Sequence, residues 1–325
     1  MKHIFIINPV AGGARGVEDA LRTALCNTSY DWELYTTTAP MDAVRYIRER
    51  CQSGEPMRFY ACGGDGTLQE VAVGTYGCSN ASFSCYPSGS GNDFVKYYGK
   101  VDYFRRLPAL LESKDVPVDL IQVGERFSLN VLNFGFEAAV ADTMEKLRHK
   151  PLIGGKNAYT VGILKSLINS MRTPVRVICD GELFYEGDCL LCTVANGQYV
   201  GGSFRCAPRS RNDDGLMDIC LVKPISRLRF VSLIGKYVRG EHLDDPKLKP
   251  IMLYRRCKSI QVEGLDERFA YTLDGEVMHE RSFYAQMVQH AVKFGVPAIK
   301  HQEKQTGSKK QPVRPAAVTA ETAHR

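Results

Sequence analysis

The decapeptide CGGDGTLQEV, residues 62–71, contains the first residues whose types and spacing could do chemistry. It follows MRFYA, a run typical of a buried strand, and leads into a short helical pattern. Its glycines leave the backbone bare, so the N–H groups of the turn and the next helix N-terminus can approach a phosphate. Asp65 would repel that phosphate unless a divalent cation, or water on one, lies between them. The stretch therefore predicts half of a nucleotide–metal site, and the alternative is a tight turn with an aspartate cap.

Two more loops rich in small polar residues follow neighbouring predicted strands, at residues 8–13 and 88–93. Asn8, Thr67 and Ser90 offer small groups suited to phosphates, and Asp93 adds a second carboxylate. Such loops at successive strand ends are typical of ligand sites in parallel sheets. The first loop lacks the Lys-Ser/Thr ending of a P-loop, which excludes a Walker-type site.

The second half of the chain contributes two acidic turns. RNDDG, residues 211–215, places Asp213 and Asp214 side by side, and Mg²⁺ prefers such oxygen ligands; the alternative is a plain β-turn. In LDGE, residues 273–276, a carboxylate could accept the proton of a substrate hydroxyl during phosphoryl transfer. The alternative for LDGE is a hairpin turn, because Asp-Gly is a common turn signal.

The elements that must position these residues change character along the chain. Over about the first 100 residues, four strand-like runs alternate with helical ones, which predicts βαβ units and a parallel sheet. The runs are strands at 2–8, 32–37, 57–61 and 81–87, and helices at 17–26, 40–50 and after residue 93. Beyond residue 118 strand-like runs dominate, with helices expected only near residues 157–171 and 226–239.

We therefore predict an α/β plus all-β fold. Residues 1–120 form an α/β domain with a parallel sheet, and residues 121–297 an antiparallel β-sandwich domain, its C-terminal end free to return to the first domain. Residues 298–325 lack large apolar side chains, which predicts a disordered tail.

Composition narrows the function classes. The net charge of +6 fits an anionic substrate or membrane surface, and no basic run interleaved with aromatics suggests nucleic acid. No apolar run reaches the roughly 18 residues of a membrane span, and the first residues read as a strand rather than a secretory signal. Eleven scattered cysteines indicate reduced thiols and a cytoplasmic protein. We expect peripheral contact with the inner face of the membrane, and a homodimer is compatible with the sequence.

Six motifs occur in one order: INPVAGG, GGDGTLQEV, PSGSGNDF, NFGFEAAV, RNDDGLMDICLV and LDGEV. Together they resemble the soluble diacylglycerol kinase catalytic-domain family, which includes bacterial lipid kinases and the sphingosine and ceramide kinases. The resemblance covers residues 1–297 and implies phosphorylation of a lipid hydroxyl by ATP. It also implies that residues 1–120 are the ATP-binding domain, that residues 121–297 are the lipid-substrate domain, and that the active site lies in the cleft between them. The chain departs from the family pattern at Gln69, where Asn is usual, at Ser90-Gly91, and at Val277.

The resemblance also implies roles for residues. ATP contacts fall on Asn8, Pro9, Val10, Ala11, Gly12, Thr37, Gly64, Asp65, Gly66, Thr67, Leu68, Gln69, Glu70, Ser90 and Asp93. Mg²⁺ is expected at Asp214 with the carbonyls of Arg211 and Leu216, linked through water to Asp65 and Asp93. The proton acceptor is Glu276 or Asp274, and we favour Glu276.

Three functions remain open at this level. The first is an ATP- and Mg²⁺-dependent kinase for a diacylglycerol-like lipid, with a sphingoid base or another lipid as the alternative substrate. The others are a soluble-metabolite kinase such as an NAD kinase, and a catalytically silent lipid-binding protein. The helix expected at 226–239 mixes basic and apolar residues, so we expect Leu228, Phe230 and Leu233 to touch a membrane, or else the helix to pack on the core.

Overall fold

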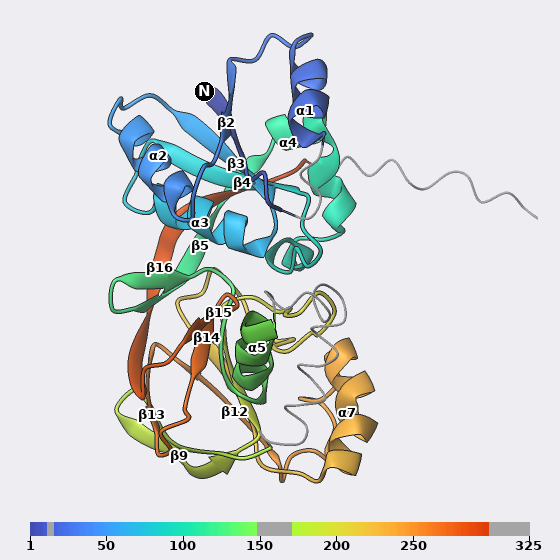
Figure 1. Cartoon of the computed structure of the whole chain (residues 1–325), viewed down its shortest axis with the longest axis vertical. Helices are drawn as coiled ribbons and strands as arrows, with labels where there is room; N and C mark the ends of the chain where they lie inside the picture. Colours follow the sequence, from blue (N-terminus) through green and yellow to red (C-terminus); the bar gives the residue numbers. More distant parts are fainter. Residues whose placement is uncertain (12–15, 148–170, 299–325) are drawn as a thin grey trace, which may run out of the picture.

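The structure, a computed structural model, describes residues 1–11, 16–147 and 171–298 and has two lobes, one above the other in Figure 1. Three predictions fall outside the described residues. They concern the loop residue Gly12, nearly all of the helix expected near residues 157–171, and the tail from residue 299 onward.

The first lobe is built on four parallel strands in the order β2-β1-β3-β4. The strands are β1 (Lys2–Ile7), β2 (Trp32–Thr36), β3 (Met57–Gly63) and β4 (Ala81–Pro87), and the crossover helices are α1 (Val17–Leu25), α2 (Asp42–Cys51) and α3 (Asp65–Thr75). Every residue of β3 is buried, as expected for a central strand covered on both faces. The chain moves outward from β1 to β2 and then returns past β1 to β3. Right-handed crossovers therefore place α1 on one face and α2 and α3 on the other.

After β4 the chain forms three short turns of helix instead of the single helix that we predicted. They are the 3₁₀ helices η1 (Phe94–Tyr97) and η2 (Val101–Arg105), and α4 (Leu107–Leu111). Gly99 lies between the first two with a φ of 135°, a conformation outside the helical range that interrupts the run.

Two long strands, β5 (Lys114–Val123) and β16 (Ser282–Val296), run from one lobe to the other as an antiparallel pair. At one end of β16, Phe294 pairs in parallel with Phe83 of β4. At its other end β16 continues the sheet through β13 (Ser259–Gly264), β8 (Thr173–Cys179) and β9 (Glu182–Cys189). With β6 (Arg126–Ser128) on β5, the result is one mixed ten-stranded sheet that both lobes share.

A second sheet of six antiparallel strands lies in the lower lobe in the order β12-β11-β10-β7-β14-β15. Its strands are β12 (Met252–Cys257), β11 (Met217–Val222), β10 (Leu191–Ala195), β7 (Val131–Gly135), β14 (Tyr271–Leu273) and β15 (Glu276–Met278). Fully buried Leu132 and Ile219 from this sheet share a core with Val177 and Ile260 from the other. Two sheets packed in this way form a sandwich, which confirms the predicted fold class of α/β plus all-β.

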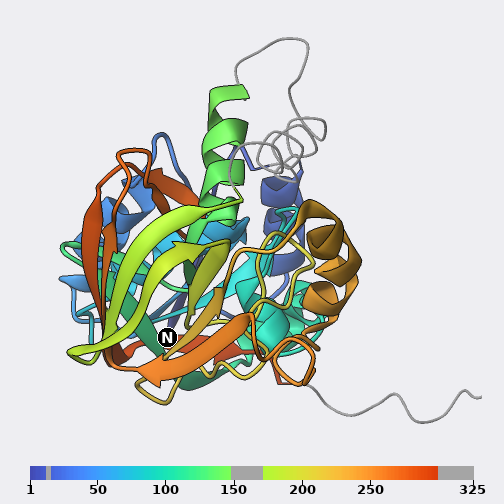
Figure 2. The same cartoon turned by 90° about the horizontal axis from the view of Figure 1, so that it is seen from below.

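Two helices, α5 (Phe136–Leu147) and α7 (Arg227–Arg239), cover the outer face of the six-stranded sheet, as Figure 2 shows from below. We predicted α7, whose ends carry clear signals: the Ser226 hydroxyl caps the Arg229 N–H, and Gly240 ends the helix with a φ of 72°. We missed α5, because the apolar run of β7 continues into it with only Gly135 between. Among the described residues, none of the helices has the length and apolarity needed to cross a bilayer.

Candidate active site

The loops after β1 and β3 meet where the strand order reverses, which is where open α/β sheets bind ligands. Asn8 joins them: its side-chain amide donates to the Thr67 hydroxyl at 3.0 Å, and its backbone N–H donates to the Cys62 carbonyl at 3.1 Å. Its side-chain oxygen accepts the Val10 N–H at 3.1 Å. Asn8 therefore holds the two glycine-rich loops together, with the N-terminus of α3 between them.

The loop at residues 88–93 packs backbone to backbone against the GGDG turn. The Gly89 N–H donates to the Gly63 carbonyl at 3.0 Å, and a Cβ on Gly89 would lie 2.3 Å from the Gly64 Cα. A Cβ on Gly91 would lie 2.5 Å from an Asp65 carboxylate oxygen. Glycine is required at both positions because any side chain there would separate the loops. We call these packed loops, residues 8–11, 63–67 and 88–93, the nucleotide corner.

Two carboxylates come together in the nucleotide corner. Asp65, at the start of α3, accepts a hydrogen bond from the Asp93 N–H at 2.5 Å. Burial and, after it, the neighbouring charge of Asp93 raise the pKa of Asp65 to about 6, against hydrogen bonds and the Lys96 charge that lower it. A carboxylate with a raised pKa at a strand end is typical of a site that receives a cation or a proton.

Asp93 also joins the two lobes. Its carboxylate accepts the N–H of Gly202 at 2.9 Å, and Lys96 donates both to that carboxylate at 2.5 Å and to the Gly202 carbonyl at 2.7 Å. Gln69 makes a second link, from α3 to the Phe127 carbonyl of β6 at 2.9 Å. We did not predict Lys96, although its position three residues after Asp93 is a signal for an ion pair.

The other residues predicted to contact ATP surround the corner. Thr37 directly follows β2, and its hydroxyl donates to the Ile7 carbonyl at 3.3 Å. Ser90 and Val10 are exposed, and Val10 is 88% accessible. Glu70 accepts backbone hydrogen bonds from Met41 and Ala43 at the start of α2. Pro9, Ala11, Gly64, Gly66, Thr67 and Leu68 lie in the first two loops or the first turn of α3.

The two acidic residues of LDGE have different surroundings. The Asp274 carboxylate accepts the Ser128 hydroxyl and three backbone N–H groups, those of Leu129, Asn130 and Val131, at 2.6 to 3.0 Å. Burial nevertheless raises its pKa. Asp274 sits in the turn with a φ of 48°, and these bonds fix that turn against β7. Its oxygens are therefore committed to holding the structure.

Glu276, by contrast, is exposed at the start of β15. Its charge contributes to a raised pKa of Glu70 on α3, after burial of Glu70 itself. The two carboxylates are thus near enough for their charges to interact between the lobes. Of the LDGE pair, Glu276 is the one available to a proton from outside the protein.

The predicted magnesium turn lies beside β5 and β16. The Asp119 carboxylate accepts the Gly215 N–H at 2.7 Å and the His290 N–H at 2.6 Å, which fixes the turn. Asp214 is paired with Arg256, and its other oxygen accepts the Leu216 N–H at 3.2 Å. In the described part of the chain, no hydrogen bond joins Asp214 to Asp65 or Asp93.

Metal donors at this turn are few. Over residues 1–11, 16–147 and 171–298, no three His, Cys, Asp or Glu side chains gather closely enough to hold a metal by themselves. Within the same residues, one buried oxygen of Asp213 has no hydrogen-bond partner. Any ion here would need this oxygen and peptide carbonyls, such as those of Arg211 and Leu216, as ligands.

A cavity of about 320 Å³ begins at the nucleotide corner and extends between α5, α7 and the six-stranded sheet. Asp65, Asp93 and Asp274 line it together with Gln69. Most of its wall is apolar: Leu129, Val131, Phe136, Val140, Met144, Leu190, Leu191, Val200, Phe204, Val222, Ile225, Phe230, Leu233, Ile234, Leu248, Ile251 and Met252. A long hydrocarbon chain fits such a wall.

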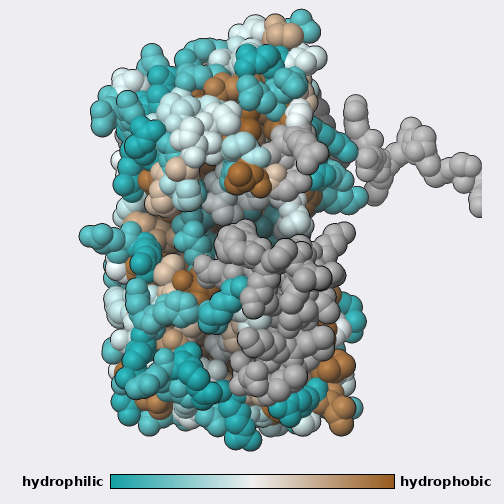
Figure 3. Space-filling view, in the orientation of Figure 1, coloured by the Kyte–Doolittle hydropathy of each residue, from teal (hydrophilic) through white to brown (hydrophobic). Residues whose placement is uncertain are grey.

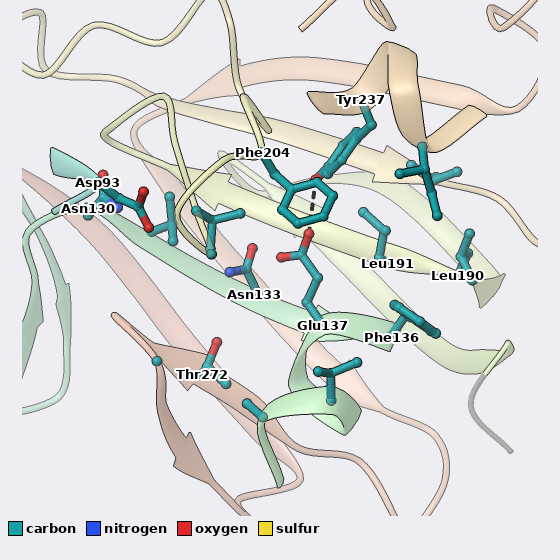
Figure 4. A pocket seen from close by; sticks show the side chains of 18 of the residues that line it. Asp93, Asn130, Asn133, Phe136, Glu137, Leu190, Leu191, Phe204, Tyr237 and Thr272 are labelled. Atoms are coloured by element: carbon teal, nitrogen blue, oxygen red, sulfur yellow. Dashed lines mark hydrogen bonds between the residues drawn. The ribbon is translucent and has the colours of Figure 1, made fainter. Parts of the chain in front are cut away.

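Several further polar side chains interrupt this wall: Asn130, Asn133, Glu137, Tyr237, His242 and Thr272. Sequence reasoning singled out none of them, and Figure 4 shows Asn133, Glu137 and Tyr237 close together. The Tyr237 hydroxyl donates to Glu137 at 3.0 Å, and burial raises the pKa of Glu137 to about 7. The run NFGFE contains Asn133 and Glu137, so a glutamate inside an apolar motif was the available signal.

The predicted membrane residues of α7 need correction. Phe230 and Leu233 line the cavity, and the Phe230 ring lies 4.9 Å from that of Phe136. The exposed apolar residues of this helix are Leu228, 86% accessible, and Val231, 58% accessible. Figure 3 shows hydrophobic surface in the region where α7 lies. One face of α7 thus closes the cavity and the other meets solvent.

Known proteins match this arrangement over nearly its whole length. The family described as diacylglycerol kinase catalytic domain matches residues 2–123, and the family described as YegS C-terminal NAD kinase beta sandwich-like domain matches residues 130–295. A protein named diacylglycerol kinase from Bacillus subtilis is 28% identical over 76% of this chain and 80% of its own. A probable lipid kinase YegS-like from Pseudomonas aeruginosa PAO1 is 28% identical over 79% and 82%.

A solved structure has the same fold. The crystal structure titled as a putative diacylglycerol kinase from Bacillus anthracis superposes with a TM-score of 0.69. It is 24% identical and covers 90% of this chain and 96% of its own.

Proposed function

The chain belongs to the diacylglycerol kinase catalytic-domain family, as its motifs predict, and on that premise we propose that it phosphorylates the hydroxyl of a diacylglycerol-like lipid with MgATP. The product is a phosphatidic-acid-type phosphomonoester, which places the protein in phospholipid metabolism. One observation carries this proposal: Asp65 and Asp93 of the nucleotide corner line the same cavity as Asp274 and an apolar wall. A nucleotide at one end and an alkyl chain at the other would meet there.

On the donor side, the backbone does most of the binding. The N-terminus of α3 and the glycine loops direct N–H groups and a positive dipole end toward a polyphosphate. The raised pKa of Asp65 is compatible with a magnesium-bound nucleotide, whose positive ion would restore the charged form. The residues that ATP contacts by motif match are part of this proposal.

On the acceptor side, we assign proton removal to Glu276. As the lipid oxygen attacks the γ-phosphorus and ADP leaves, the hydroxyl proton passes to the Glu276 carboxylate. Asp274 holds the turn that carries Glu276, through its hydrogen bonds to residues 128–131. Asp274 is therefore a positioning residue in this proposal.

Magnesium enters the proposal twice, as part of the MgATP substrate and as a structural ion at the turn of residues 211–216. One Asp213 oxygen has no hydrogen-bond partner among the described residues, although Arg211 Nε lies 3.4 Å from it as an ion pair. This oxygen and the carbonyls of Arg211 and Leu216 would hold such an ion once the Arg211 side chain moves, and Asp214 would join them if Arg256 moves away. When bound, the ion would neutralise the carboxylates of this turn and stiffen it.

The substrate lies in a membrane, so the protein must reach one. We propose that the exposed face of α7 docks on an anionic lipid surface, with Leu228 and Val231 inserted and the exposed Arg227 and Arg229 near the headgroups. The opposite face of the same helix lines the cavity, so docking there brings the lipid to its binding site.

Mass spectrometry of lipids phosphorylated by the purified chain tests the whole proposal. Membrane lipid extract, NAD and labelled MgATP are offered together. We expect label in the organic phase as a lipid phosphomonoester. Label in NADP would replace the lipid kinase with a soluble-metabolite kinase, and no transfer despite ATP and lipid binding would indicate a catalytically silent binding protein.

A further inference from the structure

Among the described polar side chains that line the cavity, buried oxygens of Glu137, Asn133 and Asn130 and Nδ1 of His242 have no hydrogen-bond partner. The Asn130 oxygen packs against Gly197, where a Cβ would lie 1.8 Å from it, so Glu137 and Asn133 are the oxygens that remain for a ligand. Tyr237 satisfies only one oxygen of Glu137; the other, Oε2, is buried and has no hydrogen-bond partner among the described residues. The side-chain oxygen of Asn133, a residue only 3% accessible, is in the same situation. Figure 4 shows the two side chains next to each other, both directed into the cavity. Buried polar oxygens rarely stay unpaired in a folded protein.

The backbone at the junction of β7 and α5 fixes the position of this pair. Gly135 ends β7 with a φ of 85°, and a Cβ there would lie 2.6 Å from the Leu190 carbonyl. That same carbonyl accepts the Phe136 N–H at 2.8 Å, which fixes the first turn of α5 and with it Glu137. A leucine at position 137 would complete the apolar wall. Packing alone therefore does not explain the carboxylate at this position.

The pair also lies between the two ends of the cavity. In Figure 4 Glu137 and Asn133 stand between Asp93, at the phosphate end, and the apolar side chains of Leu190, Leu191 and Phe136. In a lipid with its reactive hydroxyl at the phosphate end and its chain at the apolar end, the backbone atoms of the headgroup would lie beside this pair.

We infer that Asn133 and Glu137 recognise a second hydrogen-bond donor on the lipid, a hydroxyl, amide N–H or ammonium beside the hydroxyl that is phosphorylated. This inference rests on the proposed function and narrows its substrate class. A diacylglycerol has one hydroxyl, and its remaining oxygens are ester acceptors that would face two acceptors here. A long-chain alcohol with a second donor satisfies both oxygens, and sites built for a donor discriminate strongly against analogues that lack it.

The raised pKa of Glu137 agrees with an unfilled site. Burial raises the pKa of Glu137 to about 7, against the one hydrogen bond from Tyr237 that lowers it, so a second donor that enters would stabilise the ionised carboxylate.

The test measures kcat/KM with MgATP for three lipids at equal mole fraction in detergent micelles: 1,2-dioleoylglycerol, 1-monooleoylglycerol and sphinganine. We expect one of the two donor-bearing lipids to exceed dioleoylglycerol by about tenfold or more. Glu137→Gln keeps the size and the Tyr237 contact but offers an N–H₂ to ester carbonyls. It should reduce that preference by about tenfold and improve the use of dioleoylglycerol.

Asp142→Asn, on the same helix but outside the cavity lining, is the matched control and should leave the preference unchanged. Thermal denaturation shows that each variant is folded. A wild type that prefers dioleoylglycerol, or a Glu137→Gln variant with an unchanged preference, overturns the inference while the lipid kinase assignment stands. Phosphorylation of none of the three lipids, nor of any lipid in the extract, instead counts against the proposed function.

Discussion

The nucleotide corner and the cavity differ in what they are made of. In the corner, loops from successive strands touch through glycine backbone; Asn8, Asp65 and Asp93 have partners, whereas Ser88 Oγ and Asn92 Oδ1 have none among the described residues. In the cavity, side chains from α5, α7 and the sheet form the wall, and Asn133 and Glu137 keep unpaired oxygens. A site built from backbone N–H groups recognises phosphates, and phosphate recognition is common to all ATP-dependent kinases. The side-chain site is where the choice of acceptor must be made, so changes in the two regions should affect different kinetic constants.

The largest effect should come from the proposed proton acceptor, Glu276, at the start of β15. Glu276→Gln removes the proposed proton acceptor but keeps its shape, so kcat should fall by about 10²–10⁴-fold, as is typical when general-base catalysis is lost. Because Glu276 is exposed and makes no structural hydrogen bond among the described residues, the melting temperature should stay the same. Steady-state kinetics and thermal denaturation of the same preparation measure both.

Glu280→Gln provides the control, since Glu280 is also acidic but engages Arg126 and Tyr271 outside the cavity lining. Turnover within a fewfold of wild type for Glu276→Gln would move the proton-acceptor role to Asp274 or to solvent.

The second effect is that the ionisation of Asp65 should change activity and stability in opposite directions as pH rises. With a pKa of about 6, Asp65 is protonated in acid, so kcat/KM of the free enzyme should fall about tenfold per pH unit below 6. Stability runs the other way: the pKa is raised above its ordinary 3.8, so ionisation of Asp65 destabilises the fold as pH rises from about 4 to 6.

Asp65→Asn tests both statements. At pH 7.5 we expect about 10²-fold lower turnover, from lost charge stabilisation around the transferred phosphoryl group. The melting temperature of the variant, relative to wild type, should increase between pH 4 and pH 6 and then level off. Asp31→Asn, at an exposed surface aspartate, should change neither. A relative melting temperature that decreases over this interval would show that the Asp65 charge stabilises the fold.

Two glycines allow the regions to be perturbed in parallel. Gly89→Ala drives a Cβ into the Gly64 backbone, so we expect the KM for ATP to rise about tenfold with the lipid KM unchanged. Gly135→Ala forces a Cβ against the Leu190 carbonyl and displaces the start of α5, so the lipid KM should rise instead. Gly77→Ala is the control for backbone strain: its φ of 82° matches the 85° of Gly135, but nothing lies within 4 Å.

Equal changes of both KM values in Gly89→Ala and Gly135→Ala would mean that the corner and the cavity are one mechanical unit. The corner and the cavity would then not control different kinetic constants.

The same contrast explains what the sequence could predict. The corner follows from strand–turn–helix segments, so GGDGT and SGSGND could be identified by local spacing, and parallel strands bring their ends together. The cavity depends on register between strands far apart in the chain, such as β7 beside β10 and β14. No local pattern shows that Glu137 would meet Tyr237 one hundred residues later.

The local sequence also did not show which face of α7 is buried and which is exposed. The alternation of basic and apolar residues in α7 fits either a membrane face or a core face, and the structure gives it both: Phe230 inward, Leu228 outward. Arg256 beside Asp214 is a similar case, because β12 is paired with β11 only in the folded sheet.

The smallest effect concerns the docking of α7 on a membrane, from which the lipid would enter the cavity. Leu228→Ser with Val231→Ser removes the two exposed apolar side chains of α7, so binding to anionic liposomes should weaken about three- to tenfold, given roughly 25 cal/mol per Å² of apolar surface. Activity toward lipid in detergent micelles should hold, because neither residue lines the cavity. Leu183→Ser on β9, equally apolar and 62% accessible, is the matched control and should bind liposomes like wild type. If co-sedimentation is lost with Leu183→Ser and kept in the α7 double variant, the docking face lies on β9, away from the cavity-lining helix, and the lipid must reach the cavity by another path.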